Sequence, residues 1–166
     1  MRDDNGRAAG DVVIAREGRR WVLTADTELD RPRDEVFPFF ADARNLEVIT
    51  PPLLRFELLT PDPIEMRAGT LIDYRLRVHG LPLRWRTRIA VWDPPQRFVD
   101  EQLRGPYHLW WHEHVFEELP GGRTRMTDRI VYRPLGGRVA QRLVVERDLC
   151  AVFDHRLREI RRLLEA

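Results

Sequence analysis

The strongest constraint on the fold is a series of alternating apolar and polar segments in the second half of the chain, joined by very short connections. The connections "HGLP", "DPPQ", "RGPY" and "LPGGR" carry the glycine and proline residues that are typical of tight turns. Parallel strands need crossover connections of roughly a dozen residues or more, so these segments are expected to pair as antiparallel neighbours. The predicted strands are Thr70–Val78, Leu81–Trp92, Arg97–Arg104, Tyr107–Glu117 and Arg123–Pro134.

The residues before this meander predict a strand, two short helices and a further strand. Alternation in "RWVLTADTEL" favours a strand, and "RPRDEVFPFFADA" favours a helix with Pro32 in its first turn. Pro38 lies inside that helix and is expected to kink or shorten it. A second helical turn near Asn45–Ile49 and a strand at Leu54–Leu59 complete this part.

The last segment, residues 138–164, predicts one long amphipathic helix. Apolar residues recur there at alternating spacings of four and three, and only Glu146 interrupts the apolar stripe. A sheet with one apolar face can bury that face against such a helix. The sequence therefore predicts an α+β fold in which a curved antiparallel sheet, of about seven strands, wraps around the C-terminal helix.

Length and composition indicate a single domain. The chain has 166 residues, and we expect the domain to occupy residues 19–166, after a polar and loosely ordered segment at residues 1–18. No apolar run approaches the roughly 20 residues that span a bilayer, and the first residues lack a secretory signal. The single cysteine, Cys150, fits a reducing compartment. We therefore expect a cytoplasmic protein without a membrane span.

Charge and missing residue types narrow the function. The net charge is only +1, so we expect the protein not to bind nucleic acid. The arginines of "RLRVHGLPLRWRTR" are expected on a solvated outer face of the sheet. The sequence contains neither serine nor lysine. A serine nucleophile, a Schiff-base lysine and a phosphate-binding loop with its lysine are thus excluded. Cys150 lies in a helical segment and is expected to be a small apolar residue rather than a nucleophile.

Alternation also sorts the strand side chains onto two faces. The face opposite the arginines is the inner one, and it carries several polar groups among apolar and aromatic residues, whereas Trp92 and Trp111 fall on the outer side. Glu146 of the C-terminal helix is expected to face the space between the helix and this inner face. The alternative is that Glu146 pairs with an arginine at the edge of the helix. The predicted ligand-binding residues are Tyr74, Trp85, Phe98, Asp100, Gln102, Trp110, His112, His114, Phe116, Met126, Asp128, Tyr132 and Glu146.

The polar members of this inner face suggest a site. Buried polar groups cost free energy unless they pair with one another or with a ligand. Asp100, Gln102, His112, His114 and Asp128 can pair among themselves, and such a cluster in an apolar cavity is typical of a small-molecule site. Replacing His112 and His114 together with alanine is expected to weaken ligand binding and to leave the fold intact.

The order of elements and the motifs resemble a known superfamily. The stretches "PPQRFVDEQLRGPYHLWWHEHVFEE", "GGRTRMTDRIVYRPLGG" and "FDHRLREI" are similar to the START-like, or SRPBCC, superfamily of helix-grip proteins, in particular to a bacterial ligand-binding branch. The resemblance covers about residues 21–164. It implies a cavity between sheet and long helix that holds a hydrophobic or amphipathic ligand, and it implies no metal, no cofactor and no particular reaction.

Three functions remain open. In the first, the protein binds a small hydrophobic or amphipathic molecule without chemistry. In the second, it is an acid–base enzyme of the cyclase or dehydratase type, in which His112 or His114 is the general base and Asp128 or Asp100 orients it. In the third, it is an accessory protein that acts as a homodimer or on a neighbouring enzyme. A metal on His112, His114 and a carboxylate is a further alternative, which we disfavour because the resemblance includes none.

Overall fold

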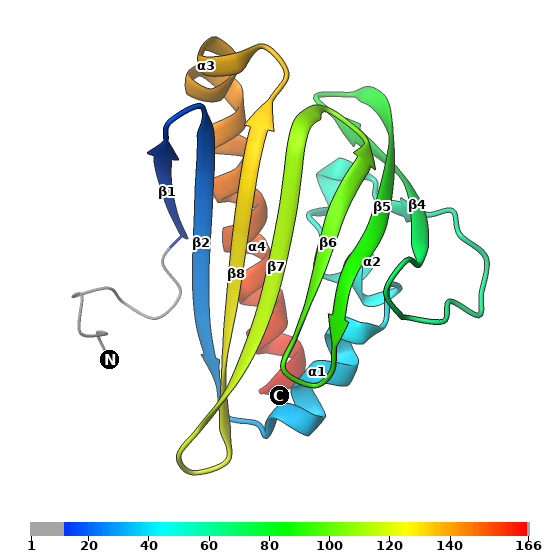
Figure 1. The fold of residues 1–166 in the computed structure, drawn as a ribbon, viewed down its shortest axis with the longest axis vertical. Coiled ribbons are helices and arrows are strands. Elements are labelled where there is room, and N and C mark those ends of the chain that lie inside the picture. The colour runs from blue at the N-terminus through cyan, green and yellow to red at the C-terminus, as the bar shows by residue number, and fades with distance from the viewer. Residues whose placement is uncertain (1–11, 166) are drawn as a thin grey trace.

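The structure is a computed structural model that describes residues 12–165. One eight-stranded antiparallel sheet, with the order β1-β2-β8-β7-β6-β5-β4-β3, curves around a long C-terminal helix (Figure 1). The strands are β1 (Val12–Glu17), β2 (Arg20–Leu29), β3 (Glu57–Leu58), β4 (Leu71–Val78), β5 (Leu81–Asp93), β6 (Arg97–Arg104), β7 (Tyr107–Leu119) and β8 (Arg123–Pro134). The predicted α+β fold is confirmed, with eight strands in place of about seven.

The helices lie where the sequence predicts them. Between β2 and β4 the chain forms α1 (Arg33–Ala41), α2 (Asn45–Val48) and the 3₁₀ turn η1 (Pro52–Leu54). The C-terminal helix is continuous and consists of α3 (Gly137–Ala140), the π-helical turn η2 (Gln141–Val145) and α4 (Glu146–Leu164). The η1 turn takes up the start of the strand predicted at Leu54–Leu59, so that strand is reduced to β3.

The N-terminal segment differs from its prediction. Residues 1–11 lie outside the described residues, whereas Val12–Glu17 form β1 and pair in antiparallel register with β2. Val12 and Ile14 pack against the cluster of buried residues around Tyr132 and Phe153. The short apolar run "VVIA" can pair with the otherwise free edge of β2, and the polar average of the segment conceals it.

A bulge in β5 reverses the predicted orientation of Trp92. The register between β5 and β6 shifts between Ile89 and Val91, and one extra residue in a strand moves the following side chains to the other face. Trp92 therefore packs inside, with ring centroids 5.5 Å from Phe37 and 5.7 Å from Phe98. The prediction that Trp92 lies on the outer face is wrong.

Helix α4 covers only part of the sheet. Its buried residues Leu149, Phe153 and Leu157 pack on Leu23 and Ile130 of β2 and β8. A separate cluster around Ile72 and Ile89 belongs to β4 and β5 and contains no residue of α4. The inner face of β4–β6 is therefore free to line a cavity.

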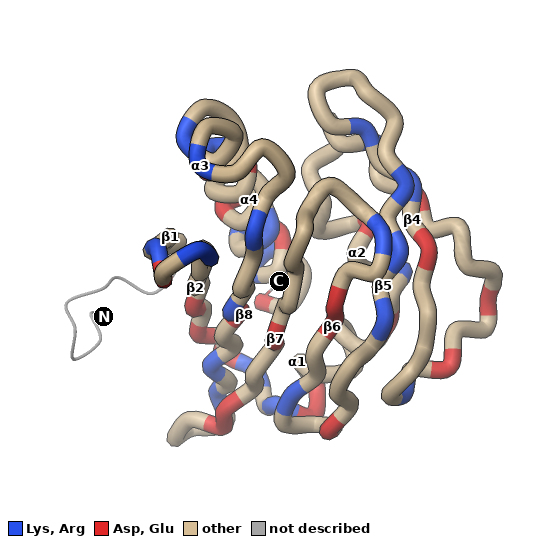
Figure 2. The backbone as a smooth tube through the Cα atoms, turned by 45° about the horizontal axis from the view of Figure 1, so that its top comes forward, with Lys and Arg blue, Asp and Glu red and all other residues tan. Residues whose placement is uncertain are grey.

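The outer face of the sheet carries paired charges. Figure 2 shows basic positions along β5 and acidic positions on the neighbouring strands β4 and β6. Arg86 of β5 donates to Asp73 of β4 at 2.8 Å, and Arg75 of β4 donates to Glu57 of β3 at 2.6–3.0 Å. These cross-strand pairs are exposed, as expected of a solvated face. No helix within residues 12–165 is long and apolar enough to span a membrane.

Candidate functional site

A cavity of about 1000 Å³ lies between the inner face of β4–β7 and helix α4. Its remaining wall comes from α1, α2, η1 and the following residues up to Phe56. Most of the lining is apolar or aromatic, with Ile72, Leu76 and Ile89 from the sheet and Phe153 from the helix. The volume is at the upper end of the range, roughly 300–1000 Å³, that is common for small-molecule sites.

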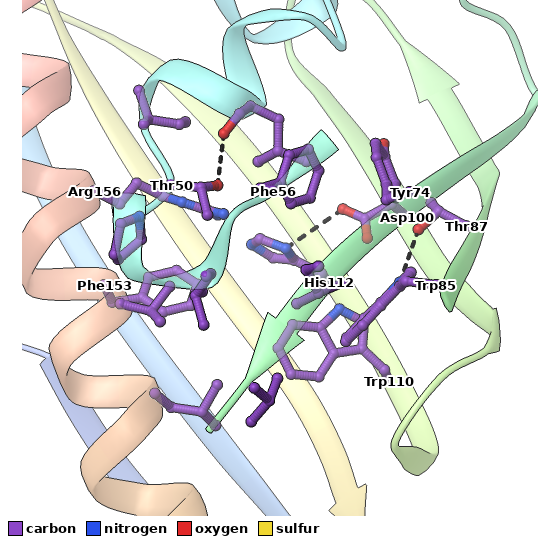
Figure 3. A pocket seen from close by; sticks show the side chains of 18 of the residues that line it. Thr50, Phe56, Tyr74, Trp85, Thr87, Asp100, Trp110, His112, Phe153 and Arg156 are labelled. Carbon is purple, nitrogen blue, oxygen red and sulfur yellow. Dashed lines mark hydrogen bonds and ion pairs between the residues drawn. The ribbon is translucent and has the colours of Figure 1, made fainter. Parts of the chain in front are cut away.

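The structure brings one part of the predicted site to the cavity wall. Aromatic and polar side chains from four neighbouring strands meet there, and Figure 3 shows several of them pointing into the same space. The predicted residues that line the cavity are Tyr74, Trp85, Phe98, Asp100, Trp110, His112 and His114.

The other predicted residues lie elsewhere. Phe116, Met126 and Tyr132 are sealed in the core, away from the cavity lining. Gln102 holds the β6–β7 turn, because its Nε2 donates to the backbone oxygen of Tyr107 at 2.7 Å. Asp128 is completely buried behind the histidines.

Glu146 is exposed and outside the cavity lining. A π turn uses one residue more than an α turn, so η2 shifts the residues before Glu146 off the face that one regular α-helix would give them. For the same reason, Val139 and Leu143 of the predicted apolar stripe are each 68% exposed.

The central feature of the wall is a buried cluster of two histidines and two aspartates, which we call the His–Asp cluster: Asp100, His112, His114 and Asp128. The sheet register creates it, because Asp100 of β6 lies opposite His112 of β7, and His114 lies opposite Asp128 of β8. The third histidine of the motif, His108, is exposed, because the β7–β8 register shifts between Tyr107 and Leu109.

Each imidazole of the cluster contacts both carboxylates. His112 Nε2 lies 2.9 Å from Asp128 Oδ1, and His112 Nδ1 lies 3.4 Å from Asp100 Oδ2. His114 Nδ1 lies 2.7 Å from Asp128 Oδ1, and His114 Nε2 lies 3.2 Å from Asp100 Oδ2. The two rings face each other with centroids 3.8 Å apart, and Phe98 stacks on His114 at 4.2 Å. Asp100 is the carboxylate nearer to the cavity, with 19% of its side chain exposed.

Electrostatics make the two histidines unlike. Burial lowers the pKa of both imidazoles, but the carboxylates of Asp128 and Asp100 outweigh burial at His114 and raise its pKa to about 9. At His112 burial and the neighbouring His114 charge prevail, so its pKa lies below the ordinary range. Burial alone would raise the pKa of each aspartate, but the imidazoles hold the pKa values of Asp100 and Asp128 below their usual range. At neutral pH the cluster thus holds two carboxylates, one imidazolium and one neutral imidazole.

The geometry also bears on a metal. Asp100, His112 and His114 each offer one ligand atom, and these atoms lie within 4.8 Å of one another. A divalent ion would have to displace the imidazolium proton of His114 and the existing hydrogen bonds. The residues are therefore arranged as a hydrogen-bonded ion-pair network, and a metal would require its rearrangement.

Residues 29–153, roughly three quarters of the chain, match the model of a protein family described as "Polyketide cyclase / dehydrase and lipid transport". The chain belongs to this polyketide cyclase/dehydrase family. The predicted START-like, or SRPBCC, superfamily is thereby confirmed. No match was found among curated proteins.

Solved structures with the polyketide cyclase/dehydrase fold superpose over most of the chain. Protein Ms6760 from Mycobacterium smegmatis is 22% identical, with a TM-score of 0.66 and coverage of 93% of this chain and 96% of that one. The ZhuI aromatase/cyclase from Streptomyces sp. R1128 is 21% identical, with a TM-score of 0.67 and coverage of 88% and 94%. A major latex-like protein from Panax ginseng is 13% identical, with a TM-score of 0.66 and coverage of 90% and 100%. At these identities the likeness shows the fold.

Several residues of the cavity were missed by the sequence prediction, and Arg156 is the charged one that faces the His–Asp cluster. Arg156 of α4 lines the cavity opposite the sheet, and Figure 3 shows its guanidinium extending toward His112. The sequence feature that could have predicted it is the spacing along the helix. Arg156 follows Phe153 by three residues and precedes Ile160 by four, which places it on the buried face of the helix. Thr50 and Phe56 also line the cavity, from a segment whose pattern predicts no single face.

The structure changes the expectation for the double alanine variant of His112 and His114. The two imidazoles supply the hydrogen-bond and ion-pair partners of the fully buried Asp128 within the described residues. Removing one partner of a buried ion pair costs about 3–5 kcal/mol, because it leaves an uncompensated charge. We now expect this variant to unfold easily, so it is a poor test of ligand binding.

Proposed function

We propose that the protein binds a small hydrophobic or amphipathic molecule in the cavity between the sheet and α4. The observation that carries the proposal is a cavity of about 1000 Å³ whose apolar wall contains one compact group of ionised side chains. Apolar lining supplies burial of a ligand body, and a few convergent polar groups fix its orientation. Asp100 and His112 are the cluster members we expect to face the ligand.

The family supports this proposal at a coarse level. Its description names lipid transport beside cyclase and dehydrase activity, and all three require room for a largely apolar molecule. The name of the Streptomyces neighbour gives an aromatase/cyclase activity to that protein. The aromatic pairs of this cavity, such as Trp85 and Trp110 with ring centroids 5.2 Å apart, suit a flat or elongated apolar body.

Native mass spectrometry of the purified protein tests the proposal directly. We expect a co-purified compound to add mass to the folded protein and to leave on denaturation. In a Leu76→Trp variant the larger side chain points into the cavity and should reduce the bound fraction severalfold. Leu71→Trp is the matched control, because Leu71 is exposed on the same strand. Equal occupancy in both variants would place the compound outside the cavity.

Acid–base catalysis is a second candidate, favoured by the orientation of His112. Its Nε2 is bonded to the buried Asp128, as a base is held by its orienting carboxylate, while the ring is neutral and lines the cavity. His114 and Asp128 are the supporting candidates. If the bound compound carries an acidic C–H bond, incubation in D₂O should deuterate it with the wild type and much more slowly with His112→Asn. Unchanged exchange in the variant would remove His112 as the base.

A cytoplasmic location belongs to the same proposal, since the single cysteine fits a reducing compartment. Association with a second copy or with a neighbouring enzyme is the accessory alternative. Size-exclusion chromatography with light scattering distinguishes a monomer from either assembly. A lone monomer that carries a bound compound would support ligand binding over the accessory role.

A further inference from the structure

The Arg156 guanidinium of α4 reaches the cavity without a contact ion pair in the described part of the chain. Arg156 is partly buried, its Nε is buried without a hydrogen-bond partner, and no ion pair of its guanidinium is found within residues 12–165. Its described contact is with the ring of Phe153, 4.8 Å below the guanidinium carbon. A guanidinium offers five N–H donors and remains charged in proteins. Most of this donor capacity is therefore directed at the cavity.

The nearby carboxylates are already engaged. Asp128 and Asp100 stabilise the Arg156 charge only at longer range, because their contact partners are the imidazoles of His112 and His114. Figure 3 shows the ring of His112 between Arg156 on the helix side and Asp100 on the sheet side. The Arg156 guanidinium therefore faces the cavity without a carboxylate in direct contact, whereas Asp100 is already paired with the two imidazoles.

A second donor lies on the opposite, sheet side of the cavity. Tyr74 lines the cavity, and no hydrogen bond of its hydroxyl is found within the described residues. Burial, followed by the charge of Asp100, raises the pKa of this phenol, so it remains a donor over the whole ordinary pH range. Figure 3 shows Tyr74 beside Asp100, across the cavity from Arg156, so the two donors face the same space from opposite sides.

We propose that the ligand of this cavity is an amphipathic carboxylic acid, whose carboxylate binds the Arg156 guanidinium while its apolar body lies along the aromatic wall. This inference rests on the proposed binding function and specifies its ligand class. The planar fork of arginine matches a carboxylate with two parallel hydrogen bonds, which are strong in a site of low polarity. A cationic head group would instead meet the Arg156 charge, and a neutral head would leave it unpaired.

Isothermal titration calorimetry with three compounds of one chain length tests the assignment. Decanoate, decan-1-ol and decylamine differ only in the head group. We expect the wild type to bind decanoate at least tenfold more tightly than decan-1-ol and to bind decylamine most weakly. In Arg156→Met, decanoate should lose at least tenfold in affinity while decan-1-ol stays within twofold. Arg156→Lys keeps the charge and loses the fork, so it should retain part of the preference.

The matched control is Arg147→Met on the same helix, because Arg147 is exposed and outside the cavity lining. This variant should keep the wild-type order of affinities. Wild-type binding of decan-1-ol equal to that of decanoate would overturn the carboxylate assignment and leave the binding function standing. A preference for decylamine, or an unchanged preference for decanoate in Arg156→Met, would also overturn it. Failure of all three compounds to bind would remove the binding function together with the assignment.

Discussion

At the scale of single residues, two histidines on one strand face have opposite electrostatic roles. His112 and His114 are two residues apart, are both buried and contact the same two carboxylates. The carboxylates raise the pKa of His114, while burial and the His114 charge lower that of His112. The two histidines thus differ in charge at neutral pH. The consequence is a cavity wall that, at neutral pH, holds an imidazolium beside a neutral imidazole.

The first prediction concerns pH. The pKa of His114 is raised from 6.5 to about 9 in the folded protein, so its contribution to stability is complete below pH 6.5 and is lost as pH rises through 9. We expect the free energy of unfolding to fall by about 3 kcal/mol over this window, since one pKa unit corresponds to about 1.4 kcal/mol. Urea unfolding at several pH values measures the change.

The matched pair of variants for this prediction is His114→Gln and His108→Gln. His114→Gln should be less stable overall and should lose the decline between pH 6.5 and 9. His108 is exposed on the same strand, so His108→Gln should unfold like the wild type. A decline that persists in His114→Gln would show that another group causes it.

At the scale of elements, two local irregularities decide which side chains face inward. The bulge in β5 brings Trp92 into the core, and the π turn η2 moves Val139 and Leu143 off the buried face of the C-terminal helix. Each inserts one residue into a regular repeat, so the faces of the element change beyond that point. The positions of Trp92, Val139 and Leu143 thus follow from backbone geometry more than from their residue types.

The second prediction compares two tryptophans that simple alternation places on the same face. Trp92→Ala should lower the free energy of unfolding by about 2–4 kcal/mol, because it removes packing against Phe37 and Phe98. Trp111→Ala should cost less than about 1 kcal/mol, since Trp111 lies on the outer face. Guanidinium unfolding curves measure both. Equal costs would mean that the bulge does not bring Trp92 inside.

At the scale of the whole molecule, the sheet is too wide for helix α4 to cover its whole inner face. One half of the inner face packs on α4, and the other half faces the cavity. At the covered end, β1 shields the edge of β2. The same curved sheet thus provides a filled core and a hollow site, and β1 is its edge strand at the covered end.

The third prediction removes that protection. Deletion of residues 1–17 takes away β1 with Val12 and Ile14, and should lower the melting temperature by roughly 4–8 °C, as expected for a loss of about 2 kcal/mol. The exposed edge of β2 should also promote association at high concentration. Calorimetry and light scattering measure the two effects. An unchanged melting temperature and a strictly monomeric variant would show that β1 contributes nothing to the fold.

Much of the architecture was predictable because short turns and strict alternation leave few arrangements. The bounds of β2 and of β6 coincide with the predicted ones, and alternation alone brought His112, His114, Asp100 and Asp128 together. Arg156 was missed because a charged helix residue is normally solvated, and its role depends on a cavity that spacing cannot reveal. β1 was missed because only its pairing with β2 makes it a strand.

The edge-to-face pair of Trp85 and Trp110 gives the cavity a built-in optical signal. Both indoles belong to the lining, so an occupant that replaces water around them should change the colour and intensity of their emission. Three further tryptophans lie outside the lining and contribute a constant background. Collections of unlabelled compounds can therefore be screened on the native chain, without a reporter that would itself compete for the space.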